Sequence, residues 1–239
     1  MPPIRKGDGT PVEPKGISQI RTGDGRILFD GVAIPDSVVA HYDATVEEST
    51  GGITSITDLE GSYDLSGSAT VISDGINGQQ SFRFDGTDDR MRNQSISLSD
   101  EPFSIVFVCE TQEGRPTDNA LGWYWSNYDD FDVALQDEGD TFDTWRGGDS
   151  ERNDTPDDDP HLFICELYDN DRYRLERDGS TILDNSLNAG DLNGFRLAEA
   201  NDRYLEVDFG EIVLLENHTS DDLQSERERL SDKWSIDIN

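Results

Sequence analysis

The strongest catalytic pattern in the sequence is the run Glu206-Val207-Asp208-Phe209-Gly210-Glu211. Retaining hydrolysis of a glycosidic bond needs two carboxyl groups about 5 Å apart, one as nucleophile and one as general acid. On a strand, Leu205, Val207 and Phe209 would face the core, which turns Glu206 and Asp208 outward. Because 52 of the 239 residues are Asp or Glu, such a triple is expected by accident. We therefore predict no catalytic residues and no enzymatic activity.

Two acidic loops carry the oxygen atoms that a hard cation prefers. One contains Asp85, Asp88 and Asp89, and the other spans residues 129–132. Ca²⁺ takes about six to eight oxygen ligands, and neither loop has the spacing of an EF-hand. A solvated loop with loosely held counterions is the alternative. The sequence predicts Ca²⁺ or another counter-cation at Asp85, Asp88 and Asp89, and no other cofactor.

A group of aromatic residues lies beside the acidic segments in the middle of the chain. An aromatic ring can stack on the face of a sugar while neighbouring carboxylates accept hydrogen bonds from its hydroxyl groups. Core packing of the same rings is the alternative. The predicted glycan-binding residues are Trp123, Trp125, Tyr128 and Trp145.

The charge of the chain limits its environment and its partners. Lys and Arg number only 19, so the formal net charge is -33. At molar salt the screening length falls to about 3 Å, which makes such a surface tolerable and indicates a halophilic protein. The absence of a basic patch argues against nucleic acid as a partner. No export signal and no run of about 20 apolar residues is visible, so we expect synthesis in a cytoplasm and no membrane insertion.

Residues 1–36 differ from the rest because their five bases balance five acids. Asp24-Gly25 lies between ISQIR and RILF, a pattern typical of a β-hairpin. A segment without the acidic coating need not face brine, so we interpret it as an arm buried against other subunits, with a flexible tail as the alternative. The residues assigned to assembly are Arg5, Ile20, Arg21, Ile27 and Phe29.

Residues 37–239 show the signals of an all-β domain. Short runs with apolar and polar alternation, such as SFRFDG and YLEVDFGEIVLL, are separated by turn residues and predict a sandwich. Residues 127–160 break this rhythm and are expected to form a long acidic loop region. A C-terminal helix is predicted with Thr219 as its cap and with Leu223, Leu230 and Trp234 on one face.

The two cysteines, Cys109 and Cys165, lie in apolar runs, where a free thiol behaves as a small buried hydrophobic group. Buried free cysteines are the favoured interpretation. A disulfide remains the alternative, because the sequence does not give the distance between the two Cα atoms.

Three stretches resemble concanavalin A-like, laminin-G-like domains of surface proteins and phage particles. They are the opening His41-Tyr42-Asp43-Ala44, the stretch SDGINGQQSFRFDGTDDRM at 73–91, and PFSIVFV at 102–108. The ending, with Lys233-Trp234 closing a short helix, is also similar. The resemblance implies a jelly-roll β-sandwich that binds a carbohydrate or a protein. Glucanases of this architecture carry a Glu-x-Asp-x-x-Glu strand, which is the motif that Glu206 begins.

These observations lead to a functional hypothesis. The N-terminal pattern KGISQIRTGDGRILFDG is similar to leaders of virion proteins from haloarchaeal tailed viruses. We predict a structural protein on the virion surface of a halophilic virus, a tail fibre or a capsid turret. It would contact other virion proteins, form a homo-oligomer such as a trimer or pentamer, and attach to a host-surface glycan or glycoprotein. A cellular haloarchaeal lectin or adhesin is the first alternative, and a polysaccharide hydrolase is the second.

Overall fold

The computed structural model describes the chain in segments, and the structural statements that follow concern these residues. They are 20–21, 27–29, 34–98, 102–111, 132–136, 141–146, 149–152, 159–168, 172–186, 192–200 and 203–238. The chain divides into two compact units, Met1–Pro35 and Asp36–Asn239. Among the described residues, no helix combines the length and the hydrophobicity needed to cross a membrane.

The first unit contains the predicted hairpin. Strand β1 (Ile20–Arg21) pairs antiparallel with β2 (Ile27–Phe29), and Ile20 lies opposite Phe29. The Asp-Gly turn signal therefore identified the pairing correctly. Arg5 lies outside the described residues, and so do the side chains of both strands, so the assembly role of this unit stays a prediction.

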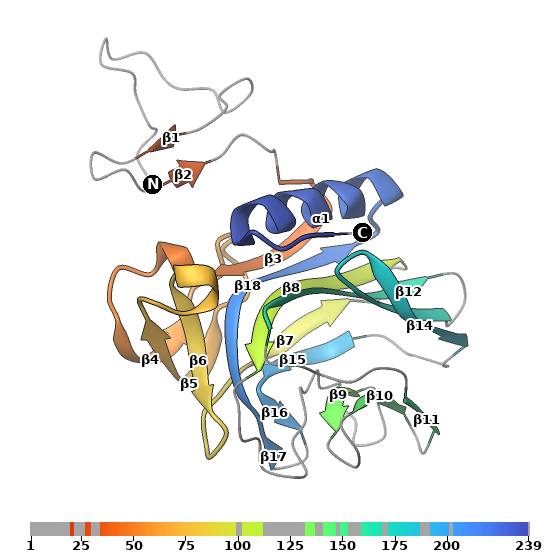
Figure 1. Ribbon diagram of the computed structural model, residues 1–239, viewed down its shortest axis with the longest axis horizontal. Helices are drawn as coiled ribbons and strands as arrows, with labels where there is room; N and C mark the ends of the chain where they lie inside the picture. Colours follow the sequence, from red (N-terminus) through yellow and green to blue (C-terminus); the bar gives the residue numbers. More distant parts are fainter. Residues whose placement is uncertain are drawn as a thin grey trace. The chain divides into compact units, whose positions relative to one another are not determined.

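The second unit is an all-β sandwich with one C-terminal helix (Figure 1). Its main sheet follows the order β14-β13-β12-β8-β18-β6-β5-β7-β15, with β3 added to β18 and β4 added to β5. The strands are β3 (Val38–Asp43), β4 (Gly51–Ile56), β5 (Leu65–Ile72), β6 (Ser81–Asp85), β7 (Arg90–Leu98), β8 (Phe103–Thr111), β12 (His161–Tyr168), β13 (Arg172–Arg177), β14 (Ser180–Ser186), β15 (Leu192–Leu197) and β18 (Glu206–Glu216).

Shorter elements complete the unit. Two 3-10 turns, η1 (Ala44–Val46) and η2 (Ile76–Gly78), and a two-stranded pair, β16 (Glu199–Ala200) with β17 (Arg203–Tyr204), accompany the main sheet. The region predicted as one long acidic loop instead holds a separate three-stranded sheet of β9 (Asp132–Gln136), β10 (Thr141–Arg146) and β11 (Asp149–Arg152). The loop prediction was wrong there because the density of Asp residues concealed the alternation in segments such as TFDTWR.

The sheet folds over on itself around one aromatic core. Tyr42 of β3 stacks on Phe195 of β15, with ring centroids 6.2 Å apart, although these strands are far apart in the sheet order. Phe107 stacks on Phe163 at 5.2 Å, and all four rings are buried. The predicted sandwich is therefore confirmed, with its core between the two layers.

Strand β18 joins the parts of the sandwich. One edge of β18 pairs with β8, while the other pairs first with β6 and then with β3. The change of partner coincides with an irregularity between Phe209 and Glu211, where Gly210 interrupts the register with β8. A bulge of this kind shifts the alternation of side chains, so Asp208 and Glu211 both lie on the face opposite Phe209.

Helix α1 (Ser220–Trp234) covers this second face of the sheet. Thr219 and Asp222 form a complete capping box, as predicted. The apolar face of α1 packs on residues of β8, β12 and β18, which explains why strand runs such as IVFVC are apolar on both faces. The members of this second apolar layer are Val38, Ile76, Val106, Val108, Leu162, Ile164, Val213, Leu215, Leu223, Leu230, Trp234 and Ile236.

Both cysteines are buried, and neither is part of a disulfide. Cys109 lies opposite His161 in the β8–β12 pair, and Cys165 lies four positions further along β12. Four strand residues span about 13 Å, well beyond the roughly 7 Å between Cα atoms that a disulfide allows. The favoured interpretation of buried thiols is confirmed.

The contact between Gly210 and Trp234 gives a prediction about stability. A Cβ atom at Gly210 would lie 2.6 to 2.7 Å from three ring carbons of Trp234. We expect Gly210→Ala to lower the free energy of unfolding by about 1–3 kcal/mol, because the core must shift to accept the methyl group. Urea unfolding in molar KCl measures this effect. Gly52→Ala is the matched control, since a Cβ there meets nothing within 4 Å; an equal loss in both variants would contradict the packing argument.

Candidate functional site

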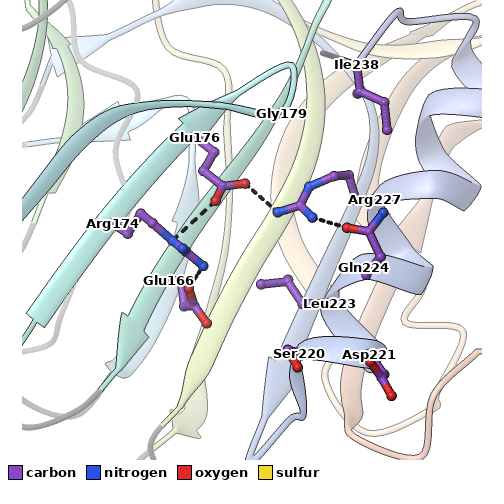
Figure 2. Close-up of a pocket in the computed structure, with 10 residues that line it drawn as sticks. All are labelled: Glu166, Arg174, Glu176, Gly179, Ser220, Asp221, Leu223, Gln224, Arg227 and Ile238. Atoms are coloured by element: carbon purple, nitrogen blue, oxygen red, sulfur yellow. Dashed lines mark hydrogen bonds and ion pairs between the residues drawn. The ribbon is translucent and has the colours of Figure 1, made fainter.

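A polar pocket lies between the first turns of α1, the β12–β13 pair and the end of the chain (Figure 2). Its volume is about 630 Å³, which is within the range of roughly 300–1,000 Å³ that small-molecule sites occupy. The residues that line it are Glu166, Arg174, Glu176, Gly179, Ser220, Asp221, Leu223, Gln224, Arg227 and Ile238.

The strands place three charged side chains on the pocket side of the sheet. Glu166 follows Ile164 on the face that α1 covers, and Arg174 is its direct partner on β13. Glu176 lies two positions after Arg174 and therefore on the same face of β13. The turn between these strands uses positive φ angles at Asp178 and Gly179, of 50° and 79°, which an Asp-Gly pair adopts at little cost.

The charged side chains form a continuous chain of contacts across the pocket (Figure 2). Arg174 NH2 lies 2.5 Å from Glu166 Oε2, and Arg174 Nε lies 3.2 Å from Glu176 Oε1. The other oxygen of Glu176 is 2.5 Å from Arg227 NH2, and Arg227 donates a further hydrogen bond to Gln224. Each planar group therefore orients the next.

The ion pairs across the pocket keep its side chains charged. Burial acts to lower the pKa of Arg174, but attraction by Glu166 and Glu176 outweighs it and raises the pKa. His218 lies near Glu166, and its Nε2 atom forms a hydrogen bond of 2.8 Å with the hydroxyl group of Ser104. Burial lowers the pKa of His218, which favours the neutral imidazole near pH 7.

The pocket offers a set of hydrogen-bonding groups that contact one another. The carboxylates of Glu166 and Glu176 are held by guanidinium groups, and that of Asp221 is exposed at the start of α1. Sequence reasoning missed this site, because its residues come from strands and from α1. The only sequence signal was the density of charge in YRLER and SERER, which is typical of solvated faces.

Two carboxylates of the β18 triple, those of Asp208 and Glu211, contact basic side chains. We predicted that Asp208 faces outward from the core, and it does lie on the outer face, but it is buried there. Arg83 covers it with two hydrogen bonds, from Nε at 2.8 Å and from Nη2 at 2.7 Å. A side chain on the outer face can thus still be covered by an arginine of the neighbouring strand.

Glu211 is fully buried and accepts from four donors. His41 Nε2 lies 2.6 Å from Oε1, and Arg229 NH1 lies 2.7 Å from the same oxygen. Lys233 Nζ lies 2.5 Å from Oε2, which also accepts a hydrogen bond from Trp234 Nε1. Burial acts to raise the pKa of Glu211, but Lys233, Arg229 and His41 outweigh it and hold the pKa well below 4.5.

This cluster also resembles a metal-ligand group. His41, Asp43 and Glu211 bring ligand atoms within 4.8 Å of one another. Lys233 Nζ, however, contacts both carboxylates, at 2.7 Å from Asp43 and 2.5 Å from Glu211. The cation that this group requires is thus supplied by the protein.

The three carboxylates of the predicted cation loop do lie together in the structure. Carboxylate oxygens of Asp85, Asp88 and Asp89 lie within 4.8 Å of one another. Asp85 Oδ1 accepts backbone N–H groups from Thr87 at 2.8 Å, Asp88 at 3.3 Å and Asp89 at 3.4 Å. Burial acts to raise the pKa of Asp85, but these hydrogen bonds outweigh it and lower the pKa. A bound Ca²⁺ stays a prediction, which a calcium titration of the melting temperature would test.

The predicted aromatic site lies outside the described residues. Trp123, Trp125 and Tyr128 belong to a stretch that the structure does not describe, and for Trp145 only its backbone position in β10 is given. The glycan role of these residues therefore stays a prediction.

Comparison with known proteins shows the fold. No family model and no curated protein matches this sequence. Trypanosoma rangeli sialidase in complex with 2,3-difluorosialic acid is similar over 91% of this chain and 36% of its own, with a TM-score of 0.59 and 10% identity. The chain spans about a third to a half of the structures that it matches.

Two binding domains resemble the fold of this chain with equal TM-scores. The binding domain of Paraclostridial Mosquitocidal Protein 1 has a TM-score of 0.61 and 14% identity, over 84% of this chain and 53% of that one. The ligand binding domain of botulinum neurotoxin serotype D, in complex with N-acetylneuraminic acid, has a TM-score of 0.61 and 10% identity, over 81% and 51%. At these identities the likeness establishes the all-β sandwich and nothing finer.

The buried cluster predicts a specific dependence of stability on pH. Because the pKa of Glu211 is depressed in the folded state, its contribution is complete above its ordinary pKa of 4.5 and is lost as the pH falls toward the folded value. We expect Glu211→Gln to cost about 3 kcal/mol at pH 7, since Arg229 and Lys233 lose a buried partner. The stability of this variant should also fall less steeply below pH 4.5 than that of the wild type.

Urea unfolding from pH 7 down to pH 3, in molar KCl, measures both effects. Glu206→Gln is the matched control, because Glu206 starts the same strand and lies outside the cluster. If the free energy of unfolding fell equally with pH in Glu211→Gln and in the wild type, the depressed pKa of Glu211 would not explain the pH dependence.

Proposed function

We propose that this chain is a carbohydrate-binding module whose ligand occupies the pocket beside α1. The observation that carries the proposal is the ordered chain of carboxylate, guanidinium and amide groups across that pocket. Sugar hydroxyl groups both donate and accept hydrogen bonds, so they match fixed planar groups of both kinds. Further support comes from the similar folds of a sialidase in complex with 2,3-difluorosialic acid and of a neurotoxin ligand binding domain in complex with N-acetylneuraminic acid.

We infer binding without hydrolysis. Two of the three carboxylates in the β18 triple are buried and held by basic side chains, so they cannot approach a glycosidic bond. Similarity to a sialidase does not transfer its activity, because that chain is nearly three times longer than the matched part and fold alone does not imply function.

The finer hypothesis concerns where such a module acts. The charge of -33 supports a protein that works in concentrated salt. The balanced charge of residues 1–36 supports a buried attachment segment. Together they favour our interpretation of a tail fibre or capsid turret on a halophilic virus, which displays the sandwich to a host-surface glycan. A cellular adhesin with the same module is the alternative.

Blocking the pocket tests the binding function. Ser220 is exposed at the start of α1 and lines the pocket, so Ser220→Tyr places a ring at its mouth. We expect at least a tenfold loss of binding on an array of immobilised glycans in molar KCl. Asp232→Tyr is the control, because Asp232 is exposed on the same helix outside the pocket. No binding by the wild type to any glycan would refute the function itself.

Removing residues 1–36 tests the attachment segment. We expect the full chain to form oligomers and the shortened chain to be monomeric, because the segment would lose the contacts between subunits. Light scattering of both proteins in molar salt gives their masses. Oligomers of equal size in both preparations would show that the sandwich assembles by itself.

A further inference from the structure

We propose that the pocket selects neutral sugars and rejects acidic ones such as sialic or uronic acids. This inference rests on the carbohydrate-binding function proposed above and specifies its ligand class. It follows from the charges that line the pocket and from the hydrogen-bonding atoms that the side chains leave free.

The charges in the pocket do not favour an anion. Three carboxylates line it, those of Glu166, Glu176 and Asp221, against the two guanidinium groups of Arg174 and Arg227. The neighbouring His218 has a lowered pKa because of its burial, so it adds no positive charge near pH 7. A carboxylate ligand would enter a site that already carries a net negative charge.

Both guanidinium groups also already contact oxygen atoms of the protein. Arg174 contacts Glu166 and Glu176, and Arg227 contacts Glu176 and Gln224. An acidic sugar could form a two-pronged contact with Nε and Nη2 of Arg174, or with Nη1 and Nη2 of Arg227, only by displacing one of these partners. The displaced group would then be left nearly buried without its partner, since the side chains of Glu166 and Glu176 are only 10% and 6% exposed. Such a group is costly.

The pocket also presents acceptors without a close partner, while the Nε donors of Arg174 and Arg227, which have no hydrogen-bond partner, are themselves buried. Glu166 Oε1 has only a distant neighbour, His218 Nε2 at 4.0 Å. Asp221, which is exposed at the start of α1, adds a second carboxylate, and Ser220 adds a hydroxyl group. Acceptors of this kind bind ligands that donate O–H groups. A neutral sugar brings several such donors, whereas the acid group of a sialic or uronic acid at neutral pH only accepts.

Measurements at high salt distinguish the selectivity of the pocket from repulsion by the net charge of the protein. A net charge of -33 repels any anionic glycan at low ionic strength. At about 1 M salt the screening length is roughly 3 Å, so this long-range repulsion is removed while contacts inside the pocket persist. Selectivity that remains in molar KCl must therefore come from the pocket.

The test uses the full chain in molar KCl and immobilised glycans in matched pairs that differ by one sialic or uronic acid residue at the terminus. We expect the neutral member of a bound pair to bind at least tenfold more tightly than the acidic member. Glu166→Gln and Asp221→Asn should each weaken binding of the neutral glycan at least fivefold. Asp232→Asn, the same change at an exposed position of α1 outside the pocket, should leave binding unchanged.

Each other outcome has a distinct meaning. Equal or tighter binding of the acidic member would overturn the inference and leave the carbohydrate-binding function standing. Binding that ignores Glu166→Gln and Asp221→Asn would place the ligand elsewhere and would also overturn it. No binding to any glycan would refute the proposed function, and the inference with it.

Discussion

The buried carboxylate of Glu211 is the interaction on which the rest of the structure depends. It lies just after the bulge at Gly210, where β18 changes partner from β6 to β3. Lys233 and Arg229 reach it from α1, and His41 reaches it from β3. A fully buried carboxylate is costly unless several donors neutralise it. The positions of β3, β18 and α1 are therefore set together by one group.

The docking of α1 has a direct consequence for the pocket. The end of the helix is fixed by Lys233 and Trp234, and its apolar face packs on β8, β12 and β18. Its first turns then lie beside Glu166 and Arg174 on the sheet. The two walls of the pocket belong to different elements, so their geometry follows from the same packing that stabilises the sandwich.

Charge has two different roles in this protein. The excess of carboxylates over basic groups gives the chain its net charge of -33. Some described carboxylates are paired, as in the contacts of Arg83 with Asp208 and of Arg174 with Glu166. The paired groups lie against the sheet or under the helix, where screening by salt is weak. These positions, and not the overall composition, define the candidate site.

The sequence by itself determined the features that depend on local pattern. Alternating apolar residues gave the sandwich, the Asp24-Gly25 pattern gave the pairing of β1 with β2, and Thr219 gave the start of the helix. It did not give the burial of Asp208 and Glu211, because a bulge and a covering helix decide that. It also did not give the pocket, because Glu166 and Arg227 meet only after α1 packs on the sheet. In a chain with 52 acidic residues, the carboxylates of the candidate site are distinguished by their partners in space, and only the tertiary structure supplies those partners.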